Sequence, residues 1–152
     1  KLISNYVQKF ENIFFKNLHS TFISFIPLNK FCFNIKSNKD KRGDFIEFSK
    51  SIDEDQISIF SIKKNKERGD HFHNTKVEKF LIFKGKVELI YKNISDNFYF
   101  KKKVNSKNLQ MFYSIPGWIH KIKNVGNDEV LGIVWSNEVF DKKKPDTFKL
   151  NT

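Results

Sequence analysis

The chain has 152 residues, 39% hydrophobic and 16% aromatic, which allows one sizeable core and leaves little for a second. Its net charge of +11 comes from lysines spread along the whole sequence, as expected of solvated surfaces. Because the charge is spread out, it excludes a concentrated nucleic-acid site and no other function. No apolar run approaches the roughly 18 residues of a membrane span, and the single cysteine, Cys32, excludes an internal disulfide. We therefore expect a cytoplasmic protein that binds neither nucleic acid nor membrane, with Cys32 in its core.

The N-terminal stretch has the apolar spacing of a helix, through Ile3, Tyr6, Val7, Phe10, Phe14, Leu18 and Phe22. This period predicts one amphipathic helix from Ile3 to about Phe25, ended by Pro27. Because the chain starts at Lys1 without a methionine, we also expect it to be a piece of a longer protein.

From Phe31 onward the apolar period changes to that of strands. Alternation predicts strands around 31–35, 57–59 and 87–91, and the apolar run at 80–83 is typical of a buried strand. Turn signals rich in Asn, Asp, Gly and Pro separate these runs at intervals of roughly 8 to 12 residues. The pattern predicts a helical segment at 1–28 and an all-β domain, a sandwich or barrel, at 29–152.

Three of the four histidines lie in two segments that together could hold a metal ion. His71 and His73 are two residues apart, so they project from the same face of a strand. Glu78 begins the next apolar run and could supply an oxygen from a neighbouring strand, and His120 could bring a third imidazole across a closed barrel. These ligands suit zinc, nickel, manganese, iron or copper, so their type alone does not choose the metal.

The only two arginines, Arg42 and Arg68, each begin an Arg-Gly-Asp tripeptide. An arginine kept in so lysine-rich a chain indicates that a planar guanidinium is needed, as for a carboxylate or a phosphate. An ordinary surface arginine before a turn glycine is the equal alternative for each.

The histidine segments resemble the two cupin motifs. The first reads His-x-His, four residues, Glu, six residues, Gly, from His71 to Gly85; the second reads Pro-Gly, two residues, His, three residues, Asn, from Pro116 to Asn124. Asn65 stands where the first motif usually has glycine, and Pro116 adjoins Gly117, which affects the loops more than the ligands.

A closer resemblance runs from Asp40-x-Arg42-Gly43-x-Phe45-x-Glu47 through both motifs to Pro145-Asp146-Thr147. These segments are similar to the C-terminal cupin domain of CapF/WbjC-type capsular polysaccharide enzymes, which are bifunctional nucleotide-sugar epimerase-reductases. RmlC-like sugar epimerases are more distantly similar. The resemblance implies an all-β cupin (RmlC-like) jelly-roll barrel at 29–152, preceded by an N-terminal helix, with 1–28 as a helical linker or the tail of a preceding reductase domain.

The same resemblance implies an activity and its cofactor. The activity is C3-epimerisation of a UDP-linked 4-keto-6-deoxy amino sugar in capsular or O-antigen polysaccharide biosynthesis, by a homodimer. The cofactor is a divalent metal, zinc favoured, held by His71, His73, Glu78 and His120. No GxGxxG motif is found, so no nicotinamide site is assigned to this chain.

Roles for the remaining pocket residues also follow from the resemblance. Arg42, Phe45 and Glu47 would contact the nucleotide diphosphate, with a surface strand edge as the equal alternative. Trp118 would wall the pocket, with a place in the core as its alternative. Arg68, Lys76 and the metal would stabilise the enolate. In metal-free relatives, the histidine aligned with His71 would be the base. If His71 binds the ion, Lys76 or a hydroxide held by the ion would take the proton instead; a solvated surface lysine is the alternative for Lys76.

Other functions stay open at this stage. Four protein ligands are typical of a structural zinc ion, so the metal could only hold the fold together. The domain could bind a nucleotide sugar without turnover, or serve a reductase as a metal-stabilised dimerisation module. A metal-dependent oxygenase on the same barrel is the third alternative.

Overall fold

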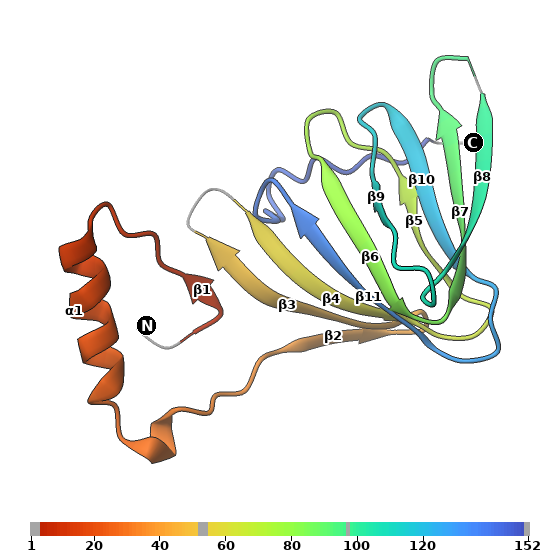
Figure 1. Cartoon of the computed structure of the whole chain (residues 1–152). Coiled ribbons are helices and arrows are strands. Elements are labelled where there is room, and N and C mark those ends of the chain that lie inside the picture. The colour runs from red at the N-terminus through yellow and green to blue at the C-terminus, as the bar shows by residue number, and fades with distance from the viewer. Residues whose placement is uncertain (1–3, 52–54, 97, 151–152) are drawn as a thin grey trace.

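The computed structural model describes residues 4–51, 55–96 and 98–150. It contains two β-sheets and, beside them, an N-terminal arm, residues 4–36 (Figure 1). The seven-stranded sheet has the order β1 (Tyr6–Val7), β3 (Gly43–Ser51), β4 (Gln56–Ile62), β11 (Val130–Ser136), β6 (Glu78–Lys84), β9 (Met111–Tyr113), and β2 (Ser37–Asp40) also pairs with β3. The four-stranded sheet has the order β5 (Glu67–His71), β10 (Trp118–Asn124), β7 (Lys86–Asn93), β8 (Tyr99–Asn105).

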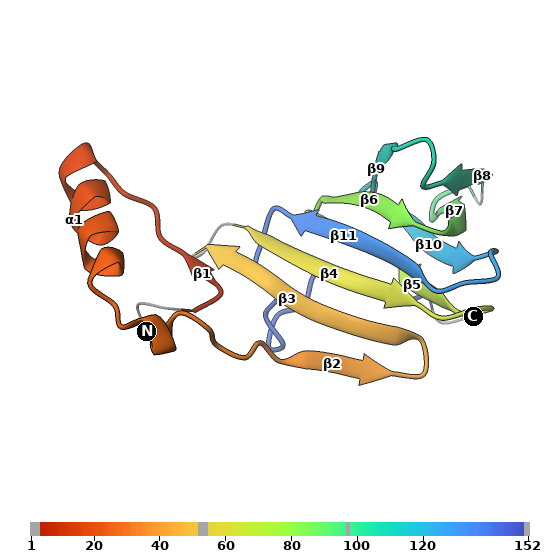
Figure 2. The same cartoon turned by 60° about the horizontal axis from the view of Figure 1, so that its bottom comes forward.

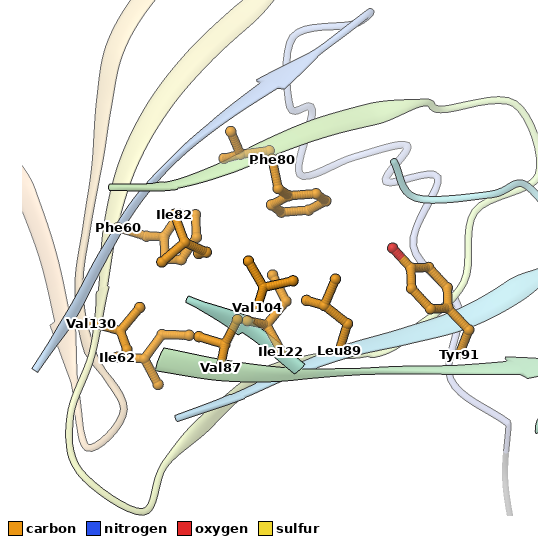
Figure 3. Packing of buried hydrophobic residues seen from close by; sticks show 11 residues of the cluster. Phe60, Ile62, Phe80, Ile82, Val87, Leu89, Tyr91, Val104, Ile122 and Val130 are labelled. Atoms are coloured by element: carbon orange, nitrogen blue, oxygen red, sulfur yellow. The ribbon is translucent and has the colours of Figure 1, made fainter. Parts of the chain in front are cut away.

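Alternating side chains of both sheets meet in one core. The buried set comprises Phe60, Ile62, Phe80, Ile82, Val87, Leu89, Tyr91, Val104, Ile122, Val130 and Val134 (Figure 3). The alternation arises because successive residues of a strand point to opposite faces, so every second residue is apolar and buried. The predicted strands at 57–59, 80–83 and 87–91 are confirmed, as parts of β4, β6 and β7.

The sheets do not close into the expected barrel. Within the described residues no ladder joins one sheet to the other: β8 pairs with β7 and β9 pairs with β6. The two sheets are instead linked near this edge by the Tyr91 hydroxyl, which donates to the Tyr113 carbonyl oxygen at 2.6 Å. The fold is therefore mostly β and cupin-like, with an open side.

The N-terminal helix is present but shorter than predicted. Helix α1 runs over Ile13–Ser24, and the expected first residue, Ile3, lies outside the described residues. The helix begins late because Tyr6 and Val7 form β1, parallel to Lys50 and Ser51 of β3, and because the Asn12 side chain accepts a hydrogen bond from the Phe15 amide as an N-cap. It ends three residues before Pro27, which precedes a 3-10 turn, η1 (Leu28–Lys30).

The predicted strand at 31–35 is wrong. Residues 31–36 form no strand, and Phe31, Phe33 and Ile35 are exposed, as is Cys32, which was expected in the core. Alternation alone does not make a strand, because a strand needs a neighbouring strand to pair with, and within the described residues no strand pairs with 31–36. No described helix is long and apolar enough to cross a membrane.

Candidate metal centre and its pocket

The local structure of β5 brings His71 opposite His120. The two histidines are directly paired in the antiparallel ladder of β5 and β10, and the register shifts by one residue immediately beyond them. Gly69 and Asp70 absorb this bulge with φ values of +90° and +66°. At Gly69 a side chain would overlap the His120 carbonyl oxygen, so only glycine lets the two strands approach this closely.

The four predicted ligands converge. Donor atoms of His71, His73, Glu78 and His120 all lie within 4.8 Å of one another, and no other such group is found among the described residues. The strand assignments, however, are the reverse of those expected: His120 comes from the strand beside His71, whereas Glu78 reaches the site from β6 of the opposite sheet. Both sheets therefore contribute to the site.

Hydrogen bonding fixes the tautomer of the buried His73 ring. Its Nδ1 donates to the Asp146 backbone carbonyl, which can only accept, so the proton of the neutral ring sits on Nδ1. Its Nε2 lone pair then faces the Glu78 carboxylate, 3.2 Å from Oε2, and the His120 Nε2 lies 3.3 Å from the same oxygen. Because a lone pair and a carboxylate repel each other, a cation between them would stabilise the arrangement.

The charge states of the cluster also suit a cation. Burial, followed by the neighbouring His120 and His73 rings, lowers the pKa of His71 to about 3, so its lone pair is free at neutral pH. The buried His120 Nδ1 has no hydrogen-bond partner within the described part of the chain.

Two of the distances between donors match those around a single ion. Nitrogen and oxygen ligands each about 2.0–2.2 Å from one ion lie roughly 3–3.5 Å apart. The separations of 3.2 and 3.3 Å from Glu78 Oε2 to the two Nε2 atoms fall in that range. Three neutral imidazoles and one carboxylate therefore make a chemically suitable metal site.

A cavity of about 500 Å³ opens onto this cluster and is lined by residues of both sheets and of the C-terminal segment. Arg42, Phe45, Glu47, Arg68 and Lys76, all predicted site residues, line it together with His71, Glu78 and His120. Trp118 does not line the cavity: it packs against the core and meets the Phe98 ring edge-on at 6.1 Å, which corrects its predicted place in the pocket wall.

Charged groups that line the cavity are held in place. The exposed Arg42 guanidinium donates from Nε to Asp40 at 2.9 Å, and this bond lowers the pKa of Asp40 well below its usual range. Arg68 donates to the carbonyl oxygens of Ser61 and Asp44, both at 2.9 Å. Glu47 pairs with Lys50.

Lys76 is almost completely buried, with 6% of its surface exposed. Its Nζ donates to the Thr147 hydroxyl at 3.3 Å and lies 4.0 Å from Glu138 and 5.9 Å from the Phe140 ring centroid. A buried ammonium needs such partners, so this lysine is placed in the pocket wall and is not a solvated surface residue.

Sequence reasoning missed several residues of the site. Gln56, Glu138 and Phe140 line the cavity, and Asp146 contacts the His73 ring and the three residues after it. Their only signal was the match of Gln56-x-Ser58 and of residues 135–147 to the family pattern, which carries no role by itself. Gln56 connects β4 to the segment around Phe140, since its Oε1 accepts a hydrogen bond from the Phe140 amide at 3.2 Å.

Comparison with known proteins gives one family match and several relatives. Residues 38–148 match the model of the polysaccharide biosynthesis C-terminal domain. A reductase of Pseudomonas aeruginosa, named for UDP-2-acetamido-2,6-beta-L-arabino-hexul-4-ose, is 37% identical over 131 residues, which are 86% of this chain and 35% of the reductase.

Solved structures agree with this match. The capsular polysaccharide assembling protein CapF of Staphylococcus aureus superposes with a TM-score of 0.91 at 34% identity, over 97% of this chain and 40% of CapF. An oxalate decarboxylase of Lactobacillus farciminis superposes with a TM-score of 0.59 at 17% identity, over 77% of this chain and 34% of the decarboxylase, which shows a shared fold only. The chain thus spans well under half the length of each of these proteins.

Proposed function

The chain belongs to the polysaccharide biosynthesis C-terminal domain family, and we propose that it is a metal-dependent epimerase domain acting on a nucleotide sugar. Its substrate would be a UDP-linked 4-keto-6-deoxy amino sugar of capsular or O-antigen biosynthesis, inverted at C3 in the cytoplasm. The observation that carries the proposal is the convergence of three imidazoles and one carboxylate on a cavity of about 500 Å³. That volume is typical of small-molecule sites.

Inversion at C3 needs three contributions from the site. The C3–H bond breaks, its electron pair delocalises toward the C4 carbonyl oxygen, and the bond forms again on the other face of the sugar. A bound zinc ion would supply Lewis acidity toward that oxygen. The chain itself must supply side chains that bind the sugar, and a base and an acid on opposite faces of C3.

We assign a proton transfer to Lys76. His71 would be occupied as a metal ligand, whereas the Lys76 amine lies in the cavity wall beside Glu138 and Thr147. Replacing it by methionine keeps the length of the side chain and removes the proton carrier. Lys76→Met should lower C3 exchange about 100-fold or more, since general acid–base groups contribute about 10²–10⁴-fold. The matched control Lys123→Met, on an exposed position of β10, should leave the rate unchanged; equal rates in both variants would remove the assignment.

The diphosphate end of the substrate would bind at the mouth of the cavity. Arg42 provides an exposed guanidinium group there, and Phe45, which also lines the cavity, packs beneath Arg68 with its ring centroid 5.8 Å from the guanidinium carbon. Glu47 and Asp40 leave the mouth with mixed charge, which suits a ligand carrying both phosphates and hydroxyls. Arg68 would also face the developing enolate from the cavity wall.

Deuterium exchange at C3 tests the activity directly. In D2O, a UDP-linked 4-keto sugar should lose its C3 proton signal in the presence of the protein, and chelation of the metal should stop the loss. Zinc is the ion we expect in elemental analysis of the purified protein. Loss of exchange in a chelated protein that stays folded indicates a catalytic ion, whereas unfolding on chelation indicates a structural one.

A non-catalytic binding module is the second candidate, because the chain spans 35% of a relative that is named as a reductase. We propose that residues 1–28 form the linker or tail of an upstream reductase domain and that 29–152 form the cupin domain. A module that only presents the sugar to that reductase would bind the nucleotide sugar and show no C3 exchange. Binding without exchange would therefore replace the epimerase assignment.

We also propose that two copies pair through the outer face of the seven-stranded sheet. One row across five strands is entirely apolar: Ile46 pairs with Ile59, Ile59 with Ile133, Ile133 with Leu81, and Leu81 with Met111. These residues alternate with the core residues Phe60, Val134 and Phe80, so they face away from the pocket. The outer face of an antiparallel sheet is normally polar if it meets water.

The size of this face suits a second copy. Five strands about 4.8 Å apart and about seven residues long present roughly 500–600 Å² in plan, which with side-chain relief approaches the ~800 Å² per partner of a standard interface. In Figure 2 no helix or strand lies in front of β4 and β11. Sedimentation should show a dimer that Ile59→Lys converts to a monomer and Leu109→Lys, at an exposed loop position, does not. A monomeric wild-type chain would contradict the pairing.

A further inference from the structure

The C-terminal segment, residues 145–148, contacts the candidate metal centre through Asp146. Asp146 is more than 70 positions from His73 along the chain, yet it contacts both that ligand and the loop that leads from His73 to the next ligand, Glu78. Neither the family match nor the sequence pattern gives this residue a role. The contacts come from two different parts of the same residue.

The backbone carbonyl of Asp146 accepts a hydrogen bond from Nδ1 of His73. This bond fixes both the tautomer and the plane of the ring, leaving Nε2 as the only atom that can bind an ion. A ring free to adopt the other tautomer would present a protonated Nε2 for part of the time and would bind an ion more weakly.

The carboxylate of Asp146 holds the backbone of residues 74–76. Oδ1 accepts from the Asn74 amide at 2.9 Å, and Oδ2 accepts from the amides of Thr75 at 2.8 Å and Lys76 at 2.7 Å and from the Thr75 hydroxyl at 3.1 Å. Charge-assisted bonds of this kind are roughly twice as strong as neutral ones. They fix the loop that spaces the ligand His73 from the ligand Glu78.

The neighbours of Asp146 anchor the segment on both sides. Thr147 accepts from the Lys76 Nζ at 3.3 Å, and Phe148 exchanges two backbone hydrogen bonds with Phe72, at 2.9 and 3.0 Å, in an isolated antiparallel bridge. Because Phe72 lies between His71 and His73, this bridge acts on the backbone that carries both imidazoles.

We propose that residues 145–148 form a positioning clamp for the metal centre, in which Asp146 orients His73 through its carbonyl and the 74–76 loop through its carboxylate. The clamp rests on the proposed metal site, although its effect on His73 can be measured without metal. Asp146 does not itself touch the ion or the substrate, so its role is positioning.

The first test is a pair of substitutions in the same C-terminal segment. Asp146→Asn turns an amide NH2 toward backbone donors and breaks part of the network. Asp141→Asn alters an exposed carboxylate that, among the described residues, accepts a hydrogen bond from the Lys143 amide at 2.8 Å. We expect Asp146→Asn to weaken zinc binding about 10–100-fold, the usual effect of disturbing the groups that orient a ligand. Asp141→Asn should bind as the wild type does, and chelator competition measures both. The visible spectrum of the cobalt-substituted protein should change in Asp146→Asn only.

The second test needs neither a variant nor a metal. Nitrogen-15 NMR of the imidazoles in the metal-free wild type should show His73 protonated at Nδ1, and the amides of residues 74–76 should be protected from hydrogen exchange. A mixed His73 tautomer or fast exchange would overturn the clamp even if Asp146→Asn fails to fold. Wild-type zinc affinity in a folded Asp146→Asn variant would overturn it as well. If the wild type binds no divalent ion, the proposed function fails, and these NMR measurements still decide whether Asp146 fixes His73.

Discussion

The metal centre and the N-terminal arm use side chains in opposite ways. Around the metal centre, polar groups are buried: His73 is 1% exposed, His120 4% and Lys76 6%. In the arm, apolar groups are exposed: helix α1 has no buried residue, and Phe14 is 64% exposed. Figure 1 shows the helix standing apart from the sheets.

This contrast separates two kinds of incomplete structure. Burying polar groups costs free energy unless partners satisfy them, and the cluster of imidazoles and Glu78 could hold an ion that does so. Exposing phenylalanines on a helix forgoes hydrophobic stabilisation, which α1 would gain if another protein surface covered it. The two regions should therefore respond independently to mutation.

The largest expected effect is the loss of metal on removing a ligand. His120→Ala should weaken zinc binding by more than about 100-fold, because it removes a donor atom itself, and disturbing groups behind a ligand already costs about 10–100-fold. The control His19→Ala removes a histidine of α1 that packs against the Phe10 ring at 5.0 Å and should leave zinc affinity unchanged. Chelator competition measures both, and tight binding by His120→Ala would disprove the four-ligand site.

Truncating side chains in the two regions should separate their contributions to stability. Ile62→Ala, at a position with no exposed surface, should lower the free energy of unfolding by about 2–5 kcal/mol, because it leaves a cavity in the core. Phe14→Ala should lower it by less than about 0.5 kcal/mol. Urea unfolding followed by tryptophan fluorescence is the measurement, since Trp118 and Trp135 both lie in the sheets. A large loss in Phe14→Ala would mean that α1 packs on the sheets in solution.

A smaller loss is expected at the glycine that lets β5 approach β10. Gly69→Ala should cost about 2–4 kcal/mol, because the left-handed backbone is strained by about 1–3 kcal/mol and the new methyl group also meets the His120 carbonyl. Gly117 also has a positive φ, +75°, but no atom lies within 4 Å of where a Cβ would be added. Gly117→Ala should therefore lower the free energy of unfolding only by the backbone strain, about 1 kcal/mol. Equal losses in urea unfolding would show that the close approach is unimportant.

The sequence predicts the site better than it predicts how the site is assembled. Residue types and spacing single out the four side chains that lie together in the structure, because a bound ion would restrict both. Strand pairing is a long-range choice, and so the sequence did not show that His120 lies beside His71 or that Glu78 comes from the other sheet. The bulge at Gly69 and the contact of Asp146 depend on backbone positions far apart in the chain, which no local pattern records.

The N-terminal arm shows a different limit. The helical period continues from Ile3 into α1, but Tyr6 and Val7 pair with β3, and the Asn12 cap decides where the helix starts. Alternation at Phe31, Phe33 and Ile35 matches a strand without supplying a partner. Periodicity describes which side of an element is apolar, and pairing decides whether the element forms.

The smallest expected effect lies at the cap of α1, where two asparagine substitutions should act in opposite directions. Asn12→Ala removes the acceptor of the Phe15 amide and should destabilise the helix by about 1 kcal/mol. Asn17→Ala, in the exposed middle of the same helix, replaces a poor helix former by the best one and should stabilise it by about 0.5 kcal/mol. Far-UV circular dichroism should show less helix in the first variant and more in the second, with an unchanged tryptophan unfolding midpoint in both. Because both tryptophans lie in the sheets, a shifted midpoint would show that the arm and the sheets unfold as one unit.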